Sequence, residues 1–205
     1  MAEVESKQQR QQQYRTQVKR RGSCIEMAIG GGGEDGVAGN DVTLIFVYGT
    51  LKRGFYNHRL IDDLMRPRHA VYLGPHTTVQ PFPLVCGPHG IPYLINLPGC
   101  GHRVLGELYS VSSGHARSRL DDLEGVHQGH YERLPIVVVD GGERVVEVEA
   151  YFAHRGFGEA LWKRCGEEGL SEFSVEMGQK YVRREDRPPH SNFIGDIHKF
   201  ISEAN

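Results

Sequence analysis

A long hairpin pattern, LPIVVVDGGERVVEVEAYFAH, constrains this chain most strongly and runs from Leu134 to His154. Asp140-Gly141-Gly142 supplies the turn, because aspartate and glycine tolerate the backbone conformations that tight hairpin turns require. In the second arm apolar residues alternate with acidic residues, which predicts a strand with one buried face. The pattern therefore predicts two antiparallel strands packed against a core.

Short β-forming runs punctuated by glycine and proline come before this hairpin. The run TLIFVYG predicts a buried strand that ends at Gly49, and HRVLGELYSV predicts another. PFPLVCGPHGIPYLINLPG predicts two short strands. HAVYLG and TTVQ predict β-structure that is interrupted at Pro75, because proline cannot donate to a strand ladder.

Two helices are predicted between these strands. In NHRLIDDLM, Asn57 is placed to cap the helix, and in SSGHARSRLDDLEG a serine start and a glycine stop bound the helix. After residue 155 the pattern weakens to a short helical run, EALWKRC, and a final helix. Many short strands with few helices predict an α+β fold with a closed or strongly curved sheet.

Composition divides the chain of 205 residues into three parts. Residues 1–41 are polar, then glycine-rich, and bury too little apolar surface to fold, so they predict a disordered leader. Residues 42–155 carry the strand and helix patterns and predict one domain. Residues 156–205 predict a partly helical C-terminal extension.

The charge balance and the cysteine positions limit the classes of partner and the cellular compartment that we expect. A formal net charge of −2 argues against nucleic acid as the main partner, and no apolar run approaches the ~20 residues of a membrane span. The cysteines are scattered at Cys24, Cys86, Cys100 and Cys165, which indicates a reducing compartment rather than a disulfide framework. We therefore expect a cytoplasmic protein with no membrane partner.

The helix that ends in RLDDLEG carries the first candidate for chemistry. Asp121, Asp122 and Glu124 crowd into its last turn, where the helix dipole and mutual repulsion both disfavour ionised carboxylates. Glu124 precedes Gly125, where the chain leaves the helix, so it can point into a pocket and exchange protons near neutral pH. The alternative is a solvated helix end, with Arg117 and Asp121 paired one turn apart.

The stretch IFVYGTLKRGFYNH carries the second candidate. Gly49 and Gly54 bracket a turn whose backbone N–H groups can form a concave anion site. Lys52 and Arg53 would add an attractive field, unless their side chains simply face water. The alternative is an ordinary strand end with a solvated basic turn.

Taken in order, FVYGTLKRGxxNH, PLV, IPYLINLPG, GELYSV and RLDDLEG closely resemble the γ-glutamylcyclotransferase-like family, also called AIG2-like. The match covers roughly residues 42–155 and is nearest to the γ-glutamylamine cyclotransferase branch, in a plant-type member. The resemblance implies a small closed β-barrel of mixed strands with flanking helices. It also implies a cyclising reaction on a small-molecule γ-glutamyl substrate, which releases 5-oxoproline and a free amine.

By position, the resemblance implies that Tyr48, Gly49, Thr50 and Leu51 bind the α-carboxylate of the glutamyl group through their backbone. Glu124 would be the catalytic acid and base. One carboxyl group with a raised pKa can carry both proton transfers, so no cofactor and no metal are expected. The expected state is a monomer.

The sequence also raises three alternatives, of which the first is a metal site. Cys86, His89, Cys100 and His102 have spacings that match no common zinc pattern. A cysteine nucleophile with a histidine base is a second reading. The third is a barrel that binds γ-glutamyl-like anions without turning them over, because a fold does not guarantee an activity. Residues that contact the leaving amine are expected in loops around 82–101 or in the C-terminal extension.

Overall fold

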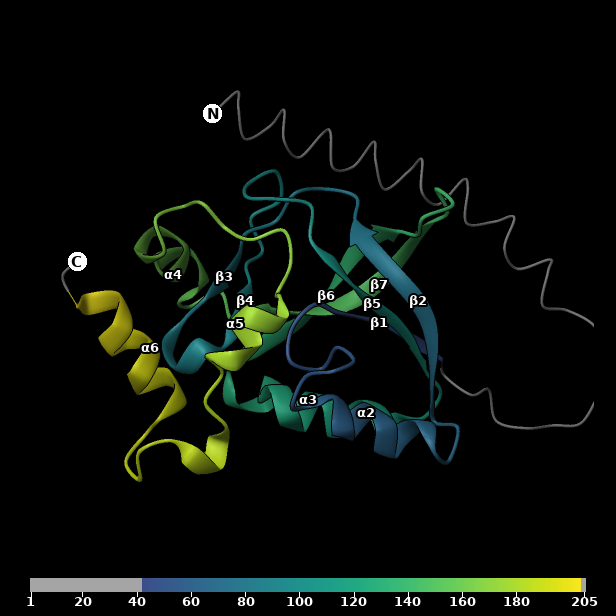
Figure 1. Ribbon diagram of the computed structural model, residues 1–205, viewed down its shortest axis with the longest axis horizontal. Coiled ribbons are helices and arrows are strands. Elements are labelled where there is room, and N and C mark those ends of the chain that lie inside the picture. Colours follow the sequence, from purple (N-terminus) through teal and green to yellow (C-terminus); the bar gives the residue numbers. More distant parts are fainter. Residues whose placement is uncertain (1–41, 204–205) are drawn as a thin grey trace, which may run out of the picture.

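Five strands close into a barrel in the computed structural model, which describes residues 42–203 (Figure 1). They are β1 (Thr43–Val47), β2 (Ala70–Thr78), β5 (Leu105–Val111), β6 (Tyr131–Val139) and β7 (Val145–Ala153). Around the barrel the order is β1-β5-β2-β6-β7, and the closing pair of β1 and β7 is parallel while the other pairs are antiparallel. The expected α+β class, with a small closed barrel of mixed strands, is confirmed.

Helices and a small second sheet surround the barrel. The sheet pairs β3 (Leu84–Cys86) with β4 (Pro92–Leu94). The helices are α2 (His58–Met65), α3 (Gly114–Glu124), α4 (Gly158–Arg164), α5 (Val175–Gln179) and α6 (Phe193–Ser202), with single 3-10 turns η2 (Pro88–Gly90), η3 (Val126–Gln128) and η4 (Arg184–Asp186). Helices α2 and α3 lie side by side below the barrel in Figure 1, joined by Arg119 and Asp63 at 3.9 Å.

Two apolar clusters use alternate positions of the same strands. Ile45 and Tyr109 belong to the cluster that packs against the helices. Phe46 and Leu108, their neighbours in sequence, belong to the second cluster. Since side chains alternate across a strand, the second cluster fills the inside of the barrel. The hairpin of β6 and β7 that the sequence predicted contributes to both clusters.

Strand β2 corrects one prediction. It runs without interruption through Pro75, which pairs with Glu107 of β5, whereas the sequence predicted a break there. β2 pairs with β6 only at Thr77 and Thr78, so along most of its length one edge is open. Proline is tolerated at such an edge because no ladder hydrogen bond is lost. The irregularity lies at Gly74, where the register shifts and φ is 109°.

Local capping signals predicted α3 well. The Ser113 side chain accepts a hydrogen bond from the N–H of Ala116, and Gly125 ends the helix in the left-handed conformation with φ of 63°. At α2 the boundary is confirmed but the cap is not. Asn57 holds the N-cap position, yet its side chain makes no capping hydrogen bond.

The segment after residue 155 packs onto the domain. Leu161 and Trp162 of α4 and Ile197 of α6 are buried in the cluster that also holds α2 and α3. The predicted leader at residues 1–41, including Cys24, lies outside the described residues. Among residues 42–203, no helix has the length and apolar content to cross a bilayer.

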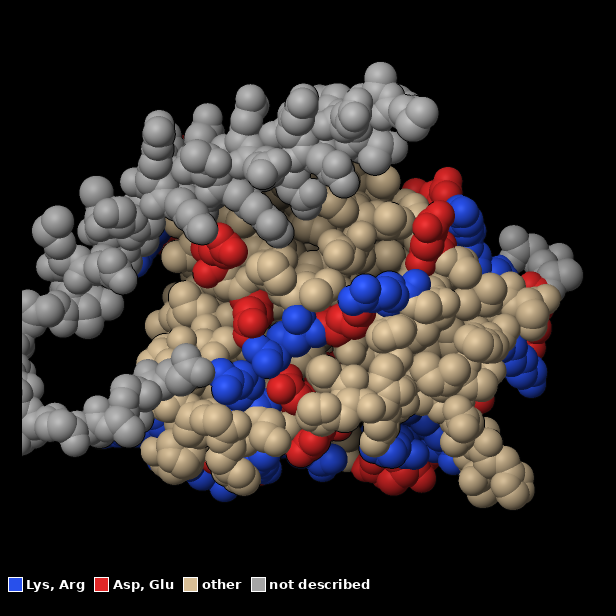
Figure 2. All heavy atoms as spheres, turned by 180° about the vertical axis from the view of Figure 1, so that it is seen from behind, with Lys and Arg blue, Asp and Glu red and all other residues tan. Residues whose placement is uncertain are grey.

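Charges of both signs are mixed on the back of the molecule where side chains are described (Figure 2). This part of the surface therefore offers no broad basic patch of the kind that duplex nucleic acid requires.

Candidate active site

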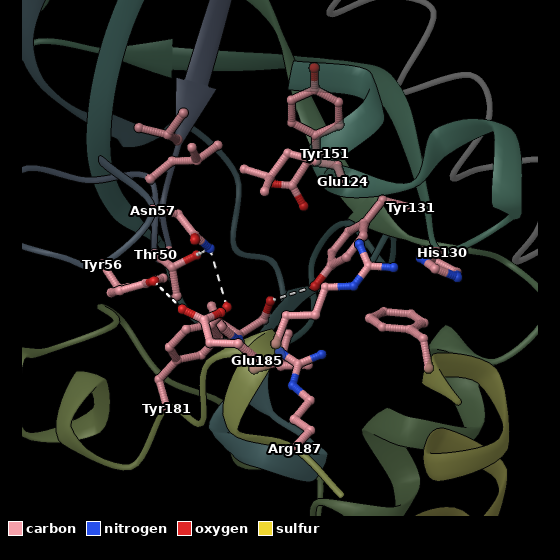
Figure 3. A pocket seen from close by; sticks show the side chains of 18 of the residues that line it. Thr50, Tyr56, Asn57, Glu124, His130, Tyr131, Tyr151, Tyr181, Glu185 and Arg187 are labelled. Atoms are coloured by element: carbon pink, nitrogen blue, oxygen red, sulfur yellow. Dashed lines mark hydrogen bonds between the residues drawn. The ribbon is translucent and has the colours of Figure 1, made fainter. Parts of the chain in front are cut away.

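A cavity of about 560 Å³ opens where the loop after β1, the end of α3, the start of β4 and the C-terminal segment meet (Figure 3). All five site residues named from the sequence line it: Tyr48, Gly49, Thr50, Leu51 and Glu124. The structure thus brings the glycine turn and the last residue of α3 to one place.

The turn after β1 presents free donors to this cavity. Lys52 N–H donates to the Gly49 carbonyl at 3.0 Å and closes the turn. The N–H groups of Gly49, Thr50 and Leu51 donate to no atom within residues 42–203. Successive unpaired N–H groups in a turn form a concave site that favours an anion.

Gly49 is required by close packing. A Cβ atom at this position would lie 2.6 Å from Cγ of Pro92, at the start of β4. Its φ is not in the left-handed region, so the demand is for space and not for an unusual backbone conformation. The ring of Pro92 therefore sets the position of the turn.

The Asn57 side chain joins this turn to the C-terminal segment. Its amide Nδ2 donates to Thr50 Oγ1 at 2.9 Å and to the Tyr181 hydroxyl at 3.3 Å. These bonds explain why Asn57 does not cap α2. Because Asn57, Thr50 and Tyr181 all line the cavity (Figure 3), the network forms part of its wall.

Tyr48 contributes mainly by holding the barrel together. Its buried hydroxyl donates to the Tyr151 carbonyl at 2.6 Å and accepts from the N–H of Leu94 at 3.2 Å. The side chain thereby ties the end of β1 to β7 and β4. Burial, and then the charge of Glu124, raise the pKa of Tyr48, so the hydroxyl stays protonated.

Lys52 and Arg53 do not line the cavity. The Lys52 side chain does not face water, because it is 5% exposed and its Nζ lies 3.0 Å from Oε1 of Glu172. The Arg53 guanidinium stacks over the Tyr72 ring, 3.3 Å from its centroid. Both charges are thus engaged elsewhere in the fold.

Glu124 is placed in the cavity by the end of α3. Ala116 and Leu120 of this helix are buried, whereas Leu123, directly before Glu124, is 40% exposed. The left-handed turn at Gly125 lets the chain leave the helix directly after Glu124. A Cβ at Gly125 would also lie 2.3 Å from Nδ1 of His130, so glycine permits this close approach.

The carboxyl group of Glu124 has a strongly shifted pKa. Burial and, second, the negative charge of Asp121 raise the pKa of Glu124 to about 7. The sequence also predicted a raised pKa for Glu124, but the main cause is burial of the carboxyl group rather than repulsion between acids at the helix end. At pKa 7 a carboxyl group both accepts and donates a proton at neutral pH.

The polar neighbours of Glu124 direct their hydroxyl groups to other atoms. The Tyr131 hydroxyl donates to the Pro92 carbonyl at 3.0 Å, and the Tyr151 hydroxyl donates to Asp121 Oδ1 at 2.8 Å. No atom within residues 42–203 donates a hydrogen bond to the Glu124 carboxyl group. Its oxygens are therefore available to a molecule in the cavity.

Several cavity residues had no signal in the sequence. They lie in the C-terminal segment and in α2, and they include Arg59, Tyr181, Arg184, Glu185, Arg187 and Phe193. His130 at the start of β6 is another, and burial and then the charge of Arg184 lower its pKa. The sequence indicated only that the extension could contact the leaving amine, because nothing in its local pattern shows which side chains turn inward.

The alternative sites gain no support from the geometry. In the described part of the chain, no three His, Cys, Asp or Glu side chains are placed to hold a metal ion. Burial, the largest cause, raises the pKa of the Cys86 thiol to about 11. A thiol with this pKa is a poor nucleophile at neutral pH.

Comparison with known proteins identifies the family. Residues 45–169 match the family described as "Gamma-glutamyl cyclotransferase, AIG2-like". The chain belongs to this family. As a γ-glutamylcyclotransferase it is an enzyme, which decides against the non-catalytic binding module considered from the sequence.

Relatives of this γ-glutamylcyclotransferase occur in plants and animals. An Arabidopsis thaliana protein, provisionally named a γ-glutamylcyclotransferase, is 43% identical over 78% of this chain and 92% of its own. The γ-glutamylaminecyclotransferase of Bos taurus is 42% identical over 52% of this chain and 63% of its own. The crystal structure of an AIG2-like protein from Mus musculus superposes with a TM-score of 0.59 at 35% identity, covering 71% of this chain and 99% of the mouse chain.

Proposed function

We propose that this enzyme is a γ-glutamylamine cyclotransferase, which releases 5-oxoproline and a free amine. The observation that carries the proposal is that Glu124, with a pKa of about 7, shares one cavity with the free N–H groups of Gly49, Thr50 and Leu51. A proton-transfer group and an anion site are the two elements that this reaction needs. The name of the bovine relative supports the amine-releasing branch.

The anion site orients the substrate. The α-carboxylate of the γ-glutamyl group accepts hydrogen bonds from the N–H groups of the turn at Gly49–Leu51. The adjacent α-ammonium then lies toward Glu124. Holding the glutamyl chain folded, with its nitrogen next to its own γ-carbonyl carbon, contributes up to ~7–11 kcal/mol by removing the entropy of the encounter.

Glu124 transfers the proton twice. Its ionised carboxylate takes a proton from the α-ammonium, and the free amine attacks the γ-carbonyl carbon to form a five-membered ring. The bond from that carbon to the leaving nitrogen then breaks. Glu124 returns this proton to the leaving nitrogen, and the second proton of the attacking nitrogen also passes to the released amine. The enzyme therefore ends in its initial state, and the products are 5-oxoproline and the amine in its ammonium form.

Replacing one oxygen of the acid tests the proposal. The Glu124→Gln variant keeps the shape of the side chain but cannot exchange the proton. We expect release of 5-oxoproline from γ-glutamyl-ε-lysine to fall by about 10²–10⁴-fold, while the variant still binds this substrate in calorimetry. A variant that turns over at a near-normal rate would refute the role of Glu124, and a wild-type enzyme inactive on all γ-glutamyl compounds would refute the function.

A further inference from the structure

The C-terminal segment from Tyr181 to Phe193 forms one wall of the cavity, although it lies beyond the family match that ends at residue 169. In Figure 3 Tyr181, Glu185 and Arg187 lie across the cavity from Glu124. A substrate held at the turn with its amine toward Glu124 must extend its leaving group into the remaining space. This segment is therefore placed to contact the leaving group.

The segment is fixed to the domain at both ends. At its start the N–H of Val182 donates to the His89 carbonyl at 2.9 Å. At its end the Phe193 ring stacks on His130 with centroids 3.9 Å apart, and Asp196 Oδ2 lies 2.9 Å from Nε2 of the same His89. The part between these anchors therefore stays against the cavity, and most of its residues are also exposed to solvent.

Only some of the charged side chains in this segment have a polar or oppositely charged partner. The Glu185 carboxylate accepts a hydrogen bond from the Tyr56 hydroxyl, and Arg183 lies 3.7 Å from Asp186. Arg184 and Arg187, which line the cavity, pair with no carboxylate among residues 42–203. Two guanidinium groups without a carboxylate partner make a cationic site inside the cavity.

The Arg187 guanidinium is held in place while most of its donors stay free. Its Nε donates to the Val182 carbonyl at 3.2 Å, and the group lies near the Tyr181 ring. The terminal nitrogens then remain for another acceptor. A planar guanidinium recognises a carboxylate through two parallel hydrogen bonds.

We propose that Arg184 and Arg187 bind a carboxylate on the leaving group. This rests on the proposed function, in which the turn at Gly49–Leu51 already holds the α-carboxylate of the glutamyl group. A second anion site in the same cavity then serves a second anion, at the other end of the substrate. The preferred substrates are γ-glutamyl conjugates of amino acids, joined through the α-amine or a side-chain amine, over conjugates of simple amines.

A matched pair of substrates tests this assignment. γ-Glutamyl-ε-lysine and γ-glutamylcadaverine differ only in the lysine carboxylate, and γ-glutamylalanine and γ-glutamylethylamine form a shorter pair. We expect kcat/KM to be about tenfold or more higher for the carboxylate-bearing member of the pair that fits. The Arg184→Gln/Arg187→Gln variant loses this preference, because its KM rises more for the carboxylate-bearing member than for the simple amine conjugate.

Arg183→Gln is the control, because Arg183 is exposed in the same segment but does not line the cavity. It should keep the preference. Equal kcat/KM within both pairs in the wild type, or an equal loss on both members in the double variant, would overturn the proposal. The second result would assign the arginines to the glutamyl end or to folding.

Binding measurements test the carboxylate site independently of the proposed catalytic function. Calorimetry on Glu124→Gln measures the affinity for each member of a pair without turnover. Tighter binding of the lysine conjugate, abolished when Arg184 and Arg187 are also replaced, supports the carboxylate site even if no 5-oxoproline forms. Equal affinities refute the carboxylate site even if 5-oxoproline forms.

Discussion

Asp121 and Glu124 lie one helical turn apart at the end of α3, and the charge of Asp121 adds to burial in raising the pKa of Glu124. Asp121 itself stays paired, with Arg133 at 3.0 Å and with the Tyr151 hydroxyl at 2.8 Å. It therefore acts as a fixed negative charge beside Glu124 and does not itself line the cavity. A substitution of Asp121 should therefore shift the pH dependence of the enzyme.

The Asp121→Asn variant should act more efficiently at low pH than the wild type. In the proposed mechanism ionised Glu124 accepts the first proton, so kcat/KM should rise with pH through the pKa of about 7. Removing the charge of Asp121 lowers that pKa, so the rise moves to lower pH, but it stays above the ordinary carboxyl range because burial is unchanged. A pH profile of kcat/KM on one substrate measures the shift.

Asp122→Asn is the control for this experiment. Asp122 is the exposed neighbour of Asp121 and does not contribute to the shifted pKa of Glu124. Its profile should coincide with that of the wild type. If Asp121→Asn also leaves the profile in place, Asp121 does not set the pKa of the catalytic group.

We expect ionisation of Glu124 to destabilise the folded protein above neutral pH. Its pKa rises from about 4.3 in an unfolded chain to about 7 in the folded protein. The folded state therefore binds this proton more tightly, so the free energy of unfolding falls as pH rises between these values. Well above pH 7 the full cost is on the order of 4 kcal/mol.

We therefore expect Glu124→Gln to raise Tm, and by more at pH 8 than at pH 5.5. The difference between the two pH values is about 2 kcal/mol, or several degrees in Tm. Glu132→Gln should behave oppositely: burial acts to raise the pKa of Glu132, but hydrogen bonds from Arg155 outweigh it and lower that pKa. A gain for Glu124→Gln that is equal at both pH values would contradict the buried-carboxyl account.

Gly49→Ala should disable the anion site through Pro92. The new Cβ would meet Cγ of Pro92 at 2.6 Å, so the turn must move away from β4. A displacement of about 1 Å at a reacting centre can cost up to about 100-fold in rate, so we expect kcat/KM to fall by about 10- to 100-fold in steady-state assays.

A second substitution tests the cause. Pro92→Ala removes Cγ and leaves only the Cβ contact at 3.4 Å, so it should restore part of the activity of Gly49→Ala. Gly114→Ala, where a Cβ meets no atom within 4 Å, should leave activity unchanged. A Gly49→Ala enzyme with normal kinetics would show that the position of the turn is not critical.

A chain that begins at Val42 should keep kcat and Tm. Residues 1–41 are too polar and glycine-rich to add a core, and the described wall of the cavity is built from residues between Phe46 and Phe193. Deletion through Val47, which removes β1, should instead abolish the folded protein. A tenfold loss of kcat in the shorter deletion would assign the first 41 residues a part in the site.

The sequence predicted those features of the fold that depend only on neighbouring residues. Ser113 and Gly125 mark the ends of α3 because capping depends on a few neighbouring residues. The interruption predicted at Pro75 was wrong because the tolerance of a proline depends on which strand edge is open. Whether a basic side chain such as Lys52 enters the site depends on Glu172, which lies 120 positions away.

In the candidate site, too, features set by neighbouring residues could be predicted and features set by distant contacts could not. The turn at Gly49 and the acid at Glu124 follow from motifs, and both line the cavity. Arg184 and Arg187 could not be found in this way, because their approach to the cavity depends on contacts of Val182 and Phe193 with distant residues. No periodic pattern encodes such contacts.

The hydrogen bond from Tyr48 to the Tyr151 carbonyl joins residues 103 positions apart. It lies where the first strand of the barrel meets the last, so the contact order of this closure is high and its loop entropy must be overcome before the contacts stabilise it. The cavity, which is lined by residues from β1 to the C-terminal segment, thus cannot form before the chain is nearly complete. Activity should therefore appear during refolding only after the barrel has closed.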